Sequence, residues 1–390
     1  MDALHGVVEP RLENRIFWPA LAVISVVLAV QNRSRLALPP HIICLLAYLA
    51  FAGTSVLWAF RPEISFTRFV QQVMIVTSVV LPAMLAARTA DMMRGIFLCF
   101  AVASILNVPF ILGGSQITVM TSNMGLETIG YPGYFLDKNS LGECAAPAVL
   151  LSLHEMLYPG LRRALGIIVA IISAVLIFLS DSKTALGLTF IAPILAGFTL
   201  IVRNKSRISI AVILLSIPFC YMTLSSLSNF NTDRISYMIF GDSTLTGRTI
   251  IWDFAQNEIA QRPLLGWGYQ SFWLVGPDAP SIVDAPGWVK MMPNAHNGYY
   301  DAMLETGYIG YVFLVTFIIA TLHAVGRVAD REPARAWLVL SLALLIISWN
   351  YLESLWMRGF DFLWVVFLIV AAEIGRYWKP FPWTVRHHIR

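Results

Sequence analysis

One histidine in a polar stretch of the chain has the type and the setting of a general base. His296 lies in the segment NAHNGYYDAMLETG. Residues 298–305 are predicted to form a helix that ends at Gly307, with Asn294 or Asn297 as its cap. A helix N-terminus disfavours an imidazolium, so we expect a neutral ring that takes a proton from a hydroxyl nucleophile. The alternative is a surface or structural histidine.

Arg248 is predicted to lie at the N-terminus of a second helix, which covers residues 249–260. The helix dipole disfavours a cation there by about 0.3–1 kcal/mol. The arrangement becomes favourable when free amides and a guanidinium converge on one phosphate. The alternative is an ion pair with Asp242 or Asp253. Steps of three and four residues make one side of this helix largely apolar, with Ile251, Phe254, Ala255, Glu258 and Ile259 on it.

Aromatic residues crowd the same stretch, above all in the segment LLGWGYQSFW. Its glycines lack the GxGxxG spacing and the strand–helix setting of a nucleotide site. The rings therefore predict either an interfacial belt or a platform on which sugar rings stack. The candidate sugar contacts are Trp252, Trp267, Tyr269, Trp273, Asn297 and Tyr300.

Metal and cofactor sites are not expected. No second histidine or cysteine stands at ligand spacing from His296, and the chain lacks an HExxH motif or a carboxylate cluster. The cysteines, which fall within or beside apolar segments, are interpreted as small core residues.

The composition is that of a membrane protein. Hydrophobic residues make up 57% of the chain and charged residues 13%, whereas soluble proteins carry about 25% charged residues. The formal net charge of +4 comes without a basic cluster interleaved with aromatics, which argues against nucleic-acid binding. We predict an all-α, polytopic integral membrane protein.

Apolar segments long enough to cross a bilayer recur along the chain, since a span needs about 20 apolar residues. We predict about 11 spans, at 16–30, 41–60, 69–87, 95–112, 141–157, 164–180, 184–202, 208–225, 311–325, 336–353 and 360–377. This divides the chain into residues 1–225 with eight spans, a long loop at 226–310 that contains short surface helices, and residues 311–390 with three spans and a tail.

Lysine and arginine positions predict the orientation. With the C-terminus in the cytoplasm, the tail and alternate loops on its side hold sixteen of the 27 basic residues. The positive-inside rule then places the long loop outside, together with residues 113–140 and the turn at 180–184. The loops assigned to the cytoplasm are 31–40, 88–94, 158–163, 203–207 and 326–335.

Three cations lie at the outward ends of spans, where this rule disfavours them: Lys138, Lys183 and Arg358. Charges kept at such positions tend to mark functional sites in membrane proteins. The alternative is that their long side chains reach towards lipid phosphates.

At these residues the chain resembles the bacterial O-antigen ligase and Wzy-type O-antigen polymerase superfamily, membrane glycosyltransferases with a GT-C-like fold. The matching pieces are DKNSLG at 137–142, SDSKTALG at 180–187, LTGRTIIW at 245–252, RPLLGWGYQSFW at 262–273 and AHNGYYDAMLETGYIG at 295–310. Together with the number of predicted spans, they cover most of the chain after Asp137.

The resemblance implies roles for particular residues. His296 matches the essential histidine and Arg248 a cation that faces the lipid diphosphate. Lys183 stands where many ligases carry arginine, and a lysine lacks the bidentate fork. This departure, together with the segments DKN and SKTAL, resembles the exopolysaccharide polymerase (ExoQ-like) branch more than the lipid A–core ligase branch. The catalytic residues would be His296 and Arg248, and the diphosphate contacts Lys183, Arg248, Lys138 and Arg358.

The resemblance also implies an activity. Undecaprenyl-diphosphate-linked repeat units would be polymerised by inverting, metal-independent transfer at the periplasmic face of the bacterial inner membrane. The partners would be the lipid-linked donor, a glycan or lipid-linked glycan acceptor, the bilayer, and chain-length regulators or export proteins.

Two other functions are considered. An O-antigen ligase would transfer the glycan to lipid A–core with the same fold and chemistry. A lipid or sugar transporter predicts charged residues in the middle of spans and broken helices in matched halves. Charges in the middle of the predicted spans are nearly absent, which makes the transporter the more distant alternative.

Overall fold

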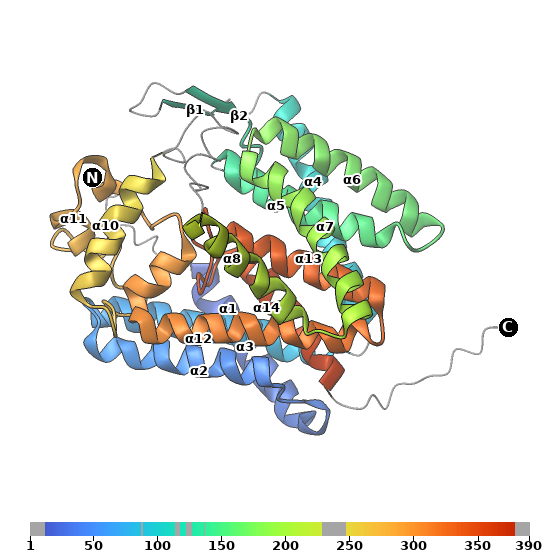
Figure 1. Ribbon diagram of the computed structural model, residues 1–390, viewed down its shortest axis with the longest axis horizontal. Helices are drawn as coiled ribbons and strands as arrows, with labels where there is room; N and C mark the ends of the chain where they lie inside the picture. The colour runs from blue at the N-terminus through green and yellow to red at the C-terminus, as the bar shows by residue number, and fades with distance from the viewer. Residues whose placement is uncertain are drawn as a thin grey trace.

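Helices dominate the computed structural model, which describes residues 12–86, 89–113, 118–121, 127–135, 137–227 and 247–378 (Figure 1). The helices are α1 Leu12–Gln31, α2 Pro40–Thr54, α3 Pro62–Leu85, α4 Thr89–Leu112, α5 Lys138–Glu155, α6 Leu161–Ser180, α7 Lys183–Ser206, α8 Ile210–Leu227, α10 Arg248–Gln261, α11 Pro280–Val283, α12 Gly298–Ala329, α13 Pro333–Trp349 and α14 Phe362–Gly375. A short antiparallel hairpin, β1 Thr118–Thr121 with β2 Glu127–Gly130, has no counterpart among the elements predicted from the sequence.

The helices are those of a polytopic membrane protein. Among the described residues, 6 helices are long and apolar enough to cross a membrane, and three shorter apolar helices accompany them. Every segment predicted as a span coincides with a helix, although the number of crossings stays a prediction. Large apolar side chains on α6 and α7 face outwards, for example Ile171, Phe190 and Ile194, which are 60%, 62% and 69% exposed. Such helix faces suit contact with lipid.

The loops gather in two groups, as the lysine and arginine pattern predicts. In one group, the main-chain N–H of Phe60 donates to the carbonyl of Trp267, and the Asn139 side chain reaches Glu353. In the other group, Arg376 donates to the carbonyl of Ala86, and Arg203 pairs with Asp330. Loops assigned to one side of the membrane therefore contact each other. Lys379, Arg386 and Arg390 lie outside the described residues.

The first span also fits this arrangement. The ring of Trp18, near the start of α1, packs edge-to-face against Phe360 with 6.4 Å between the ring centroids. Phe360 belongs to the loop between α13 and α14, which carries Glu353. The start of α1 therefore lies at the same end of the bundle as the loops that are predicted to face outwards.

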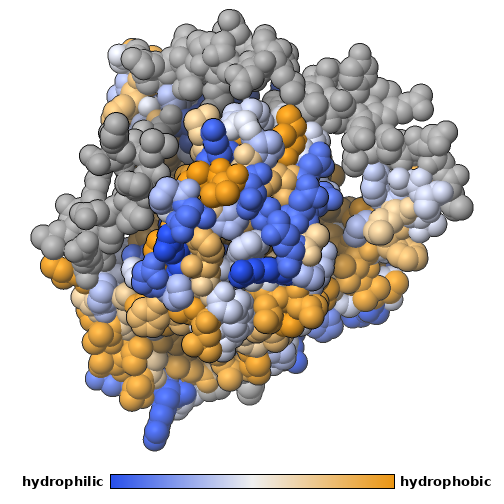
Figure 2. Space-filling view, turned by 90° about the vertical axis from the view of Figure 1, so that its left-hand side faces the viewer, coloured by the Kyte–Doolittle hydropathy of each residue, from blue (hydrophilic) through white to orange (hydrophobic). Residues whose placement is uncertain are grey.

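A second, smaller core holds α10 against the bundle. Its buried residues include Ile251, Phe254, Trp267 and Leu304, and they come from α10, the segment after it and the start of α12. All five residues on the side of α10 that the sequence predicts to be largely apolar are buried. In Figure 1, α10 and α11 lie together at one end of the molecule. Figure 2 shows that end, where hydrophilic side chains gather above a band of hydrophobic ones.

Helix α12 is broken at Gly307, the residue at which the sequence predicts a helix end. This glycine has φ 62° and ψ −171°, and a Cβ built there would clash with the carbonyl oxygen of Leu264. The segment 262–268, which follows α10, packs into this break. There Trp267 N donates to Leu304 O, and Tyr308 N donates to Pro263 O. The loop therefore satisfies backbone groups that a helix break leaves without partners. The predicted domain boundary at residue 310 falls inside this helix.

Gly307→Ala should lower the free energy of unfolding by about 2 kcal/mol, because it adds a side chain at positive φ where the Leu264 carbonyl already sits. Thermal unfolding of the purified protein in detergent measures this. The matched control is Gly187→Ala in α7, where a Cβ meets nothing within 4 Å and φ is not positive. Equal midpoints for the two variants would contradict the prediction.

Candidate functional site

One carboxylate joins the two residues that the sequence predicts as catalytic. Glu353 Oε1 lies 2.7 Å from Arg248 Nη2, and Glu353 Oε2 lies 2.8 Å from His296 Nδ1. The exposed fractions of the side chains of Glu353, Arg248 and His296 are 13%, 16% and 29%. We call these three residues the Glu353 cluster. The three side chains are therefore largely buried, but each remains partly exposed at the surface.

The loop after α13 is built to hold Glu353 in place. Gly298 N donates both to Asn350 O and to Glu353 O, so the loop's backbone caps the first turn of α12. The Asn350 side chain accepts from Leu355 N and Trp356 N at 3.0 and 2.9 Å. A Cβ at Gly298 would clash with Asn350 Oδ1, so only glycine permits this approach.

The N-cap of α12 fixes the residue next to the histidine. The Asn297 side chain accepts from Tyr299 N and Tyr300 N at 3.0 and 3.2 Å, as predicted for an N-cap. Its main-chain N–H donates to Ser354 Oγ. Asn297 is 2% exposed, so its side-chain amide forms hydrogen bonds with protein groups. The Asn297 side chain is therefore occupied as a cap, and its contact with a sugar stays a prediction.

The geometry sets the tautomer of His296. A carboxylate at Nδ1 selects the ring form that carries a proton there, which leaves Nε2 as the proton acceptor. The same carboxylate stabilises the imidazolium that forms once Nε2 takes a proton. Within the part of the chain that the structure describes, no hydrogen bond to Nε2 is found. The backbone of His296 is left-handed, with φ 47°.

Glu353 stays ionised because its two partners outweigh its burial. Burial by itself raises the pKa of the Glu353 carboxyl. The hydrogen bond and charge of His296, together with the charge of Arg248, more than offset this and hold the pKa below its ordinary value of 4.5. Arg248 thus pairs with Glu353 and not with Asp253, one of the two partners considered from the sequence. The other, Asp242, lies outside the described residues.

The DKN motif contacts this cluster from α5. Asp137 caps α5 by accepting from Ser140 N at 2.9 Å. Asn139 Nδ2 donates to Glu353 Oε1 at 3.3 Å, while Lys138 Nζ lies 3.3 Å from a carboxylate oxygen of Asp181. Lys138 therefore ties α5 to the turn that precedes α7.

Lys183 is the first residue of α7 and is exposed, two residues after Asp181. The starts of α5 and α7 pack closely, because a Cβ at Gly142 would meet Ala185 Cβ at 2.7 Å. The elements that carry Lys138, Lys183 and Arg248 are thus linked to one another through Asp181 and Glu353.

Arg358 occupies a different environment from the other cations. Its Nη2 lies 3.0 Å from Asp301 Oδ2 and 2.9 Å from Glu305 Oε1, so two buried carboxylates balance its charge. The structure does not bring Arg358 into the Glu353 cluster. Arg358 lines a neighbouring pocket instead, and its role as a diphosphate contact stays a prediction.

The predicted aromatic platform divides into core and surface residues. Trp267, Tyr269 and Trp273 are only 7%, 1% and 5% exposed, because they fill the cores beneath α10 and beside α3. Trp267 and Tyr269 are therefore packing residues, and their rings do not offer a face to a sugar. Trp273 borders a pocket.

Two of the predicted aromatic contacts do lie beside the histidine. Trp252 is half-buried and donates through Nε1 to the carbonyl of Ala295 at 3.0 Å. Its ring centroid lies 6.0 Å from that of Tyr300 and 6.1 Å from that of Tyr351. Tyr351, which is 57% exposed, is not among the contacts predicted from the sequence.

Glu353 is also absent from the site predicted by the sequence. It is the last residue of a predicted span, and a carboxylate that closes an apolar segment at its outward end is the signal that could have identified it. Among the residues that the structure describes, no group of three or more His, Cys, Asp or Glu side chains is placed to hold a metal ion.

Glu353→Gln should make the protein less stable near neutral pH by about 2 kcal/mol, because a charge-assisted pair is lost. The folded-state pKa of Glu353 is lowered, so its stabilising effect is present above about pH 4.5 and disappears as the pH falls through the folded value. The gap in unfolding midpoint between wild type and variant should therefore narrow on acidification. The exposed Glu63→Gln, in the first turn of α3, serves as control. A gap independent of pH would argue against the pairing.

Part of the chain is similar to one described protein family. Residues 168–315 match the family model Wzy_C, described as O-Antigen ligase. The matched region contains Lys183, Arg248 and His296 but ends before Glu353. Lys138 precedes it.

Individual relatives point the same way. The chain is 26% identical over 290 residues to the "Exopolysaccharide production protein ExoQ" of Rhizobium meliloti, an alignment that covers 70% of this chain and 63% of that protein. It is 25% identical over 127 residues to a "Putative polysaccharide ligase" of Rickettsia bellii, with 31% of each chain covered. The chain thus spans less than two thirds of the length of these relatives. In its helical architecture and across residues 168–315, the chain is thus similar to the O-antigen ligase family of membrane proteins.

Proposed function

We propose that this protein is a membrane glycosyltransferase that polymerises undecaprenyl-diphosphate-linked oligosaccharide repeat units. The observation that carries the proposal is the Glu353 cluster, in which one carboxylate holds His296 and Arg248 side by side. A general base and a phosphate-binding cation are the two groups that this transfer needs, and they come from segments far apart in the chain.

In the proposed reaction, His296 Nε2 takes the proton from an acceptor sugar hydroxyl. The freed oxygen attacks the anomeric carbon of the donor sugar from the face opposite the diphosphate, and a new C–O bond forms. The bond between that carbon and the diphosphate oxygen breaks with its electron pair, so undecaprenyl diphosphate leaves and the configuration inverts. Glu353 stabilises the resulting imidazolium.

Cations stabilise the departing diphosphate in this proposal. Glu353 engages Nη2 of Arg248, and a guanidinium carries five N–H donors, so donors remain for phosphate oxygens. Arg248 is also the first residue of α10, and its N-cap Gly247 has no side chain to occupy the first amides. The dipole and the guanidinium then act on the same anion. Lys183 and Lys138 supply further positive charge as metal-independent electrostatic stabilisers.

Sugar rings are proposed to rest on the aromatic group beside the histidine. Trp252 contacts the residue that precedes His296, and Tyr300 lies against it. The outward position of Tyr351 extends the same surface. Such rings offer flat apolar faces with polar edges, which suits pyranoses.

The similarity to an exopolysaccharide production protein over 70% of the chain favours a polymerase. The family description and the rickettsial relatives favour the alternative, an O-antigen ligase that transfers to lipid A–core. Both reactions would take place at the periplasmic face of the inner membrane, an orientation that rests on the distribution of Lys and Arg. The donor, the acceptor glycan, and chain-length or export proteins are the proposed partners.

His296→Ala should lower the rate of glycan transfer about 10²–10⁴-fold, because the general base is removed. The assay incubates purified protein with lipid-linked oligosaccharide and follows consumption of the donor. The matched control is His323→Ala, an exposed histidine that bonds Ser209 near the other group of loops and should retain wild-type rates. Wild-type turnover by the His296 variant would refute the proposed base.

The product identifies the acceptor. A ladder of lengthened lipid-linked glycans, formed from the donor alone, indicates a polymerase. Transfer that requires added lipid A–core, with no ladder in its absence, indicates a ligase and would overturn the polymerase proposal.

A further inference from the structure

A pocket beside the Glu353 cluster is not used by the proposed chemistry. It encloses about 170 Å³ and is lined by Arg68, Gln270, Trp273, Leu274, Pro293, Glu305 and Arg358. These residues come from α3, the segment after α10, α12 and the loop before α14. The pocket is thus assembled by the fold from distant parts of the sequence.

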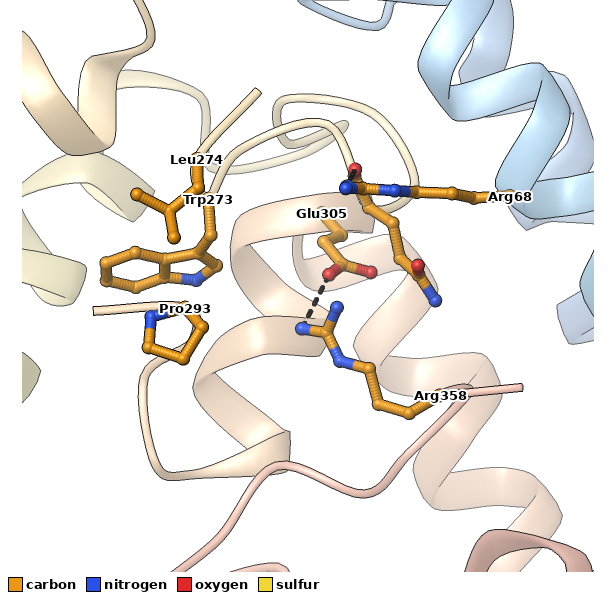
Figure 3. Close-up of a pocket in the computed structure, with 7 residues that line it drawn as sticks. Arg68, Trp273, Leu274, Pro293, Glu305 and Arg358 are labelled. Carbon is orange, nitrogen blue, oxygen red and sulfur yellow. Dashed lines mark hydrogen bonds and ion pairs between the residues drawn. The ribbon is translucent and has the colours of Figure 1, made fainter. Parts of the chain in front are cut away.

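The walls of this pocket are of two kinds (Figure 3). Trp273, Leu274 and Pro293 form one side, which is aromatic and aliphatic. Arg68, Glu305 and Arg358 lie across from them, with the ion pair between Glu305 and Arg358 in view. One apolar wall and one wall of planar polar groups match a pyranose ring, which has an apolar face of C–H groups and a rim of hydroxyls.

The polar wall keeps hydrogen-bonding capacity for a ligand. Both carboxylate contacts of Arg358 are made through Nη2, so other donors of its guanidinium remain. The Gln270 side-chain amide donates to Tyr269 Oη and to Met357 O, which leaves its side-chain oxygen as an acceptor. Glu305 Oε1 is buried and, in the described part of the chain, forms only the ion pair and no directed hydrogen bond.

The charges around the pocket are balanced and firmly held. Asp301 lies behind Arg358 and accepts from Trp273 Nε1 at 2.7 Å and from Ala295 N at 3.1 Å. The two carboxylates of Asp301 and Glu305 offset the two guanidinium groups of the polar wall. A neutral, hydroxyl-rich ligand therefore fits this lining better than an anion does.

We propose that this pocket binds one neutral pyranose ring and serves as the subsite for the acceptor sugar. Its position supports this role, because Pro293 lies three residues before His296 and Asp301 fixes the backbone of Ala295 between them. The role as acceptor subsite rests on the proposed function. The binding of a pyranose in this pocket does not depend on the proposed function, so an experiment can refute one without refuting the other.

Saturation-transfer NMR on the full-length protein in nanodiscs tests the pocket without any turnover. The probes are the methyl glycosides of glucose, galactose and mannose, with inorganic pyrophosphate as a competing anion. At least one glycoside should receive saturation from the wild-type protein. Arg68→Gln and the near-isosteric Glu305→Gln should each weaken binding of that glycoside about tenfold, the effect of losing a hydrogen bond to a charged group.

Two controls separate the pocket from the catalytic cluster. Arg262→Gln removes an exposed arginine that stacks on Trp267 and should leave glycoside binding unchanged. His296→Ala should also leave glycoside binding unchanged, although it lowers the rate of transfer about 10²–10⁴-fold. Thermal unfolding midpoints near the wild-type value show that each variant is folded.

Three results would overturn the inference: no saturation transfer to any neutral glycoside, equal signals from wild type and both pocket variants, or displacement of the glycoside by pyrophosphate. The last would identify an anion site. Glycoside binding by a wild-type protein that shows no transferase activity would instead refute the proposed function and leave the pocket assignment intact.

Discussion

The rest of the site depends on how one carboxylate is shared. Glu353 accepts from Arg248, His296 and Asn139, which belong to α10, the segment before α12, and α5. Removing one partner from a buried ion pair leaves an uncompensated charge, which is strongly destabilising. The same contacts that orient the chemical groups therefore also hold the outward loops to the helix bundle.

Local patterns are sufficient to predict the long helices of the fold, though not the β1–β2 hairpin. Apolar segments of span length predict the helices, and the buried side of α10 follows from steps of three and four residues. The cap at Asn297 and the break at Gly307 follow from the preferences of those residue types. Each of these features depends on neighbours within a few positions of the chain.

Tertiary partners cannot be predicted in the same way. Glu353 is 57 residues from His296 and 105 from Arg248, so no local spacing signals their contact. From the sequence alone, Arg358 cannot be told apart from the other cations at span ends. Its two carboxylate partners, Asp301 and Glu305, come from α12 and are distant in the sequence. Trp267 and Tyr269 are buried because of the way in which α10 and α3 pack. Their local sequence is compatible with exposed rings as well as with buried ones.

Strained backbone gathers around the site and the neighbouring pocket. Gln270, Leu274, His296 and Met357 are four of the non-glycine residues with positive φ in the described chain. Such conformations cost about 1–3 kcal/mol each and persist only where surrounding contacts hold them. These four residues lie at one end of the bundle, which indicates that tertiary contacts there hold the backbone in conformations that position the side chains of the site.

The loop that enters the break in α12 also limits how sequences of this kind can vary. Gly266 and Gly268 adopt φ 67° and 95°, and a Cβ on either would clash with neighbouring backbone. Insertions or deletions between Arg262 and Gly268 would shift the register of every N–H and carbonyl that meets the helix. Length differences among homologues should therefore accumulate on either side of this short segment, which would keep a constant length while its surroundings diverge.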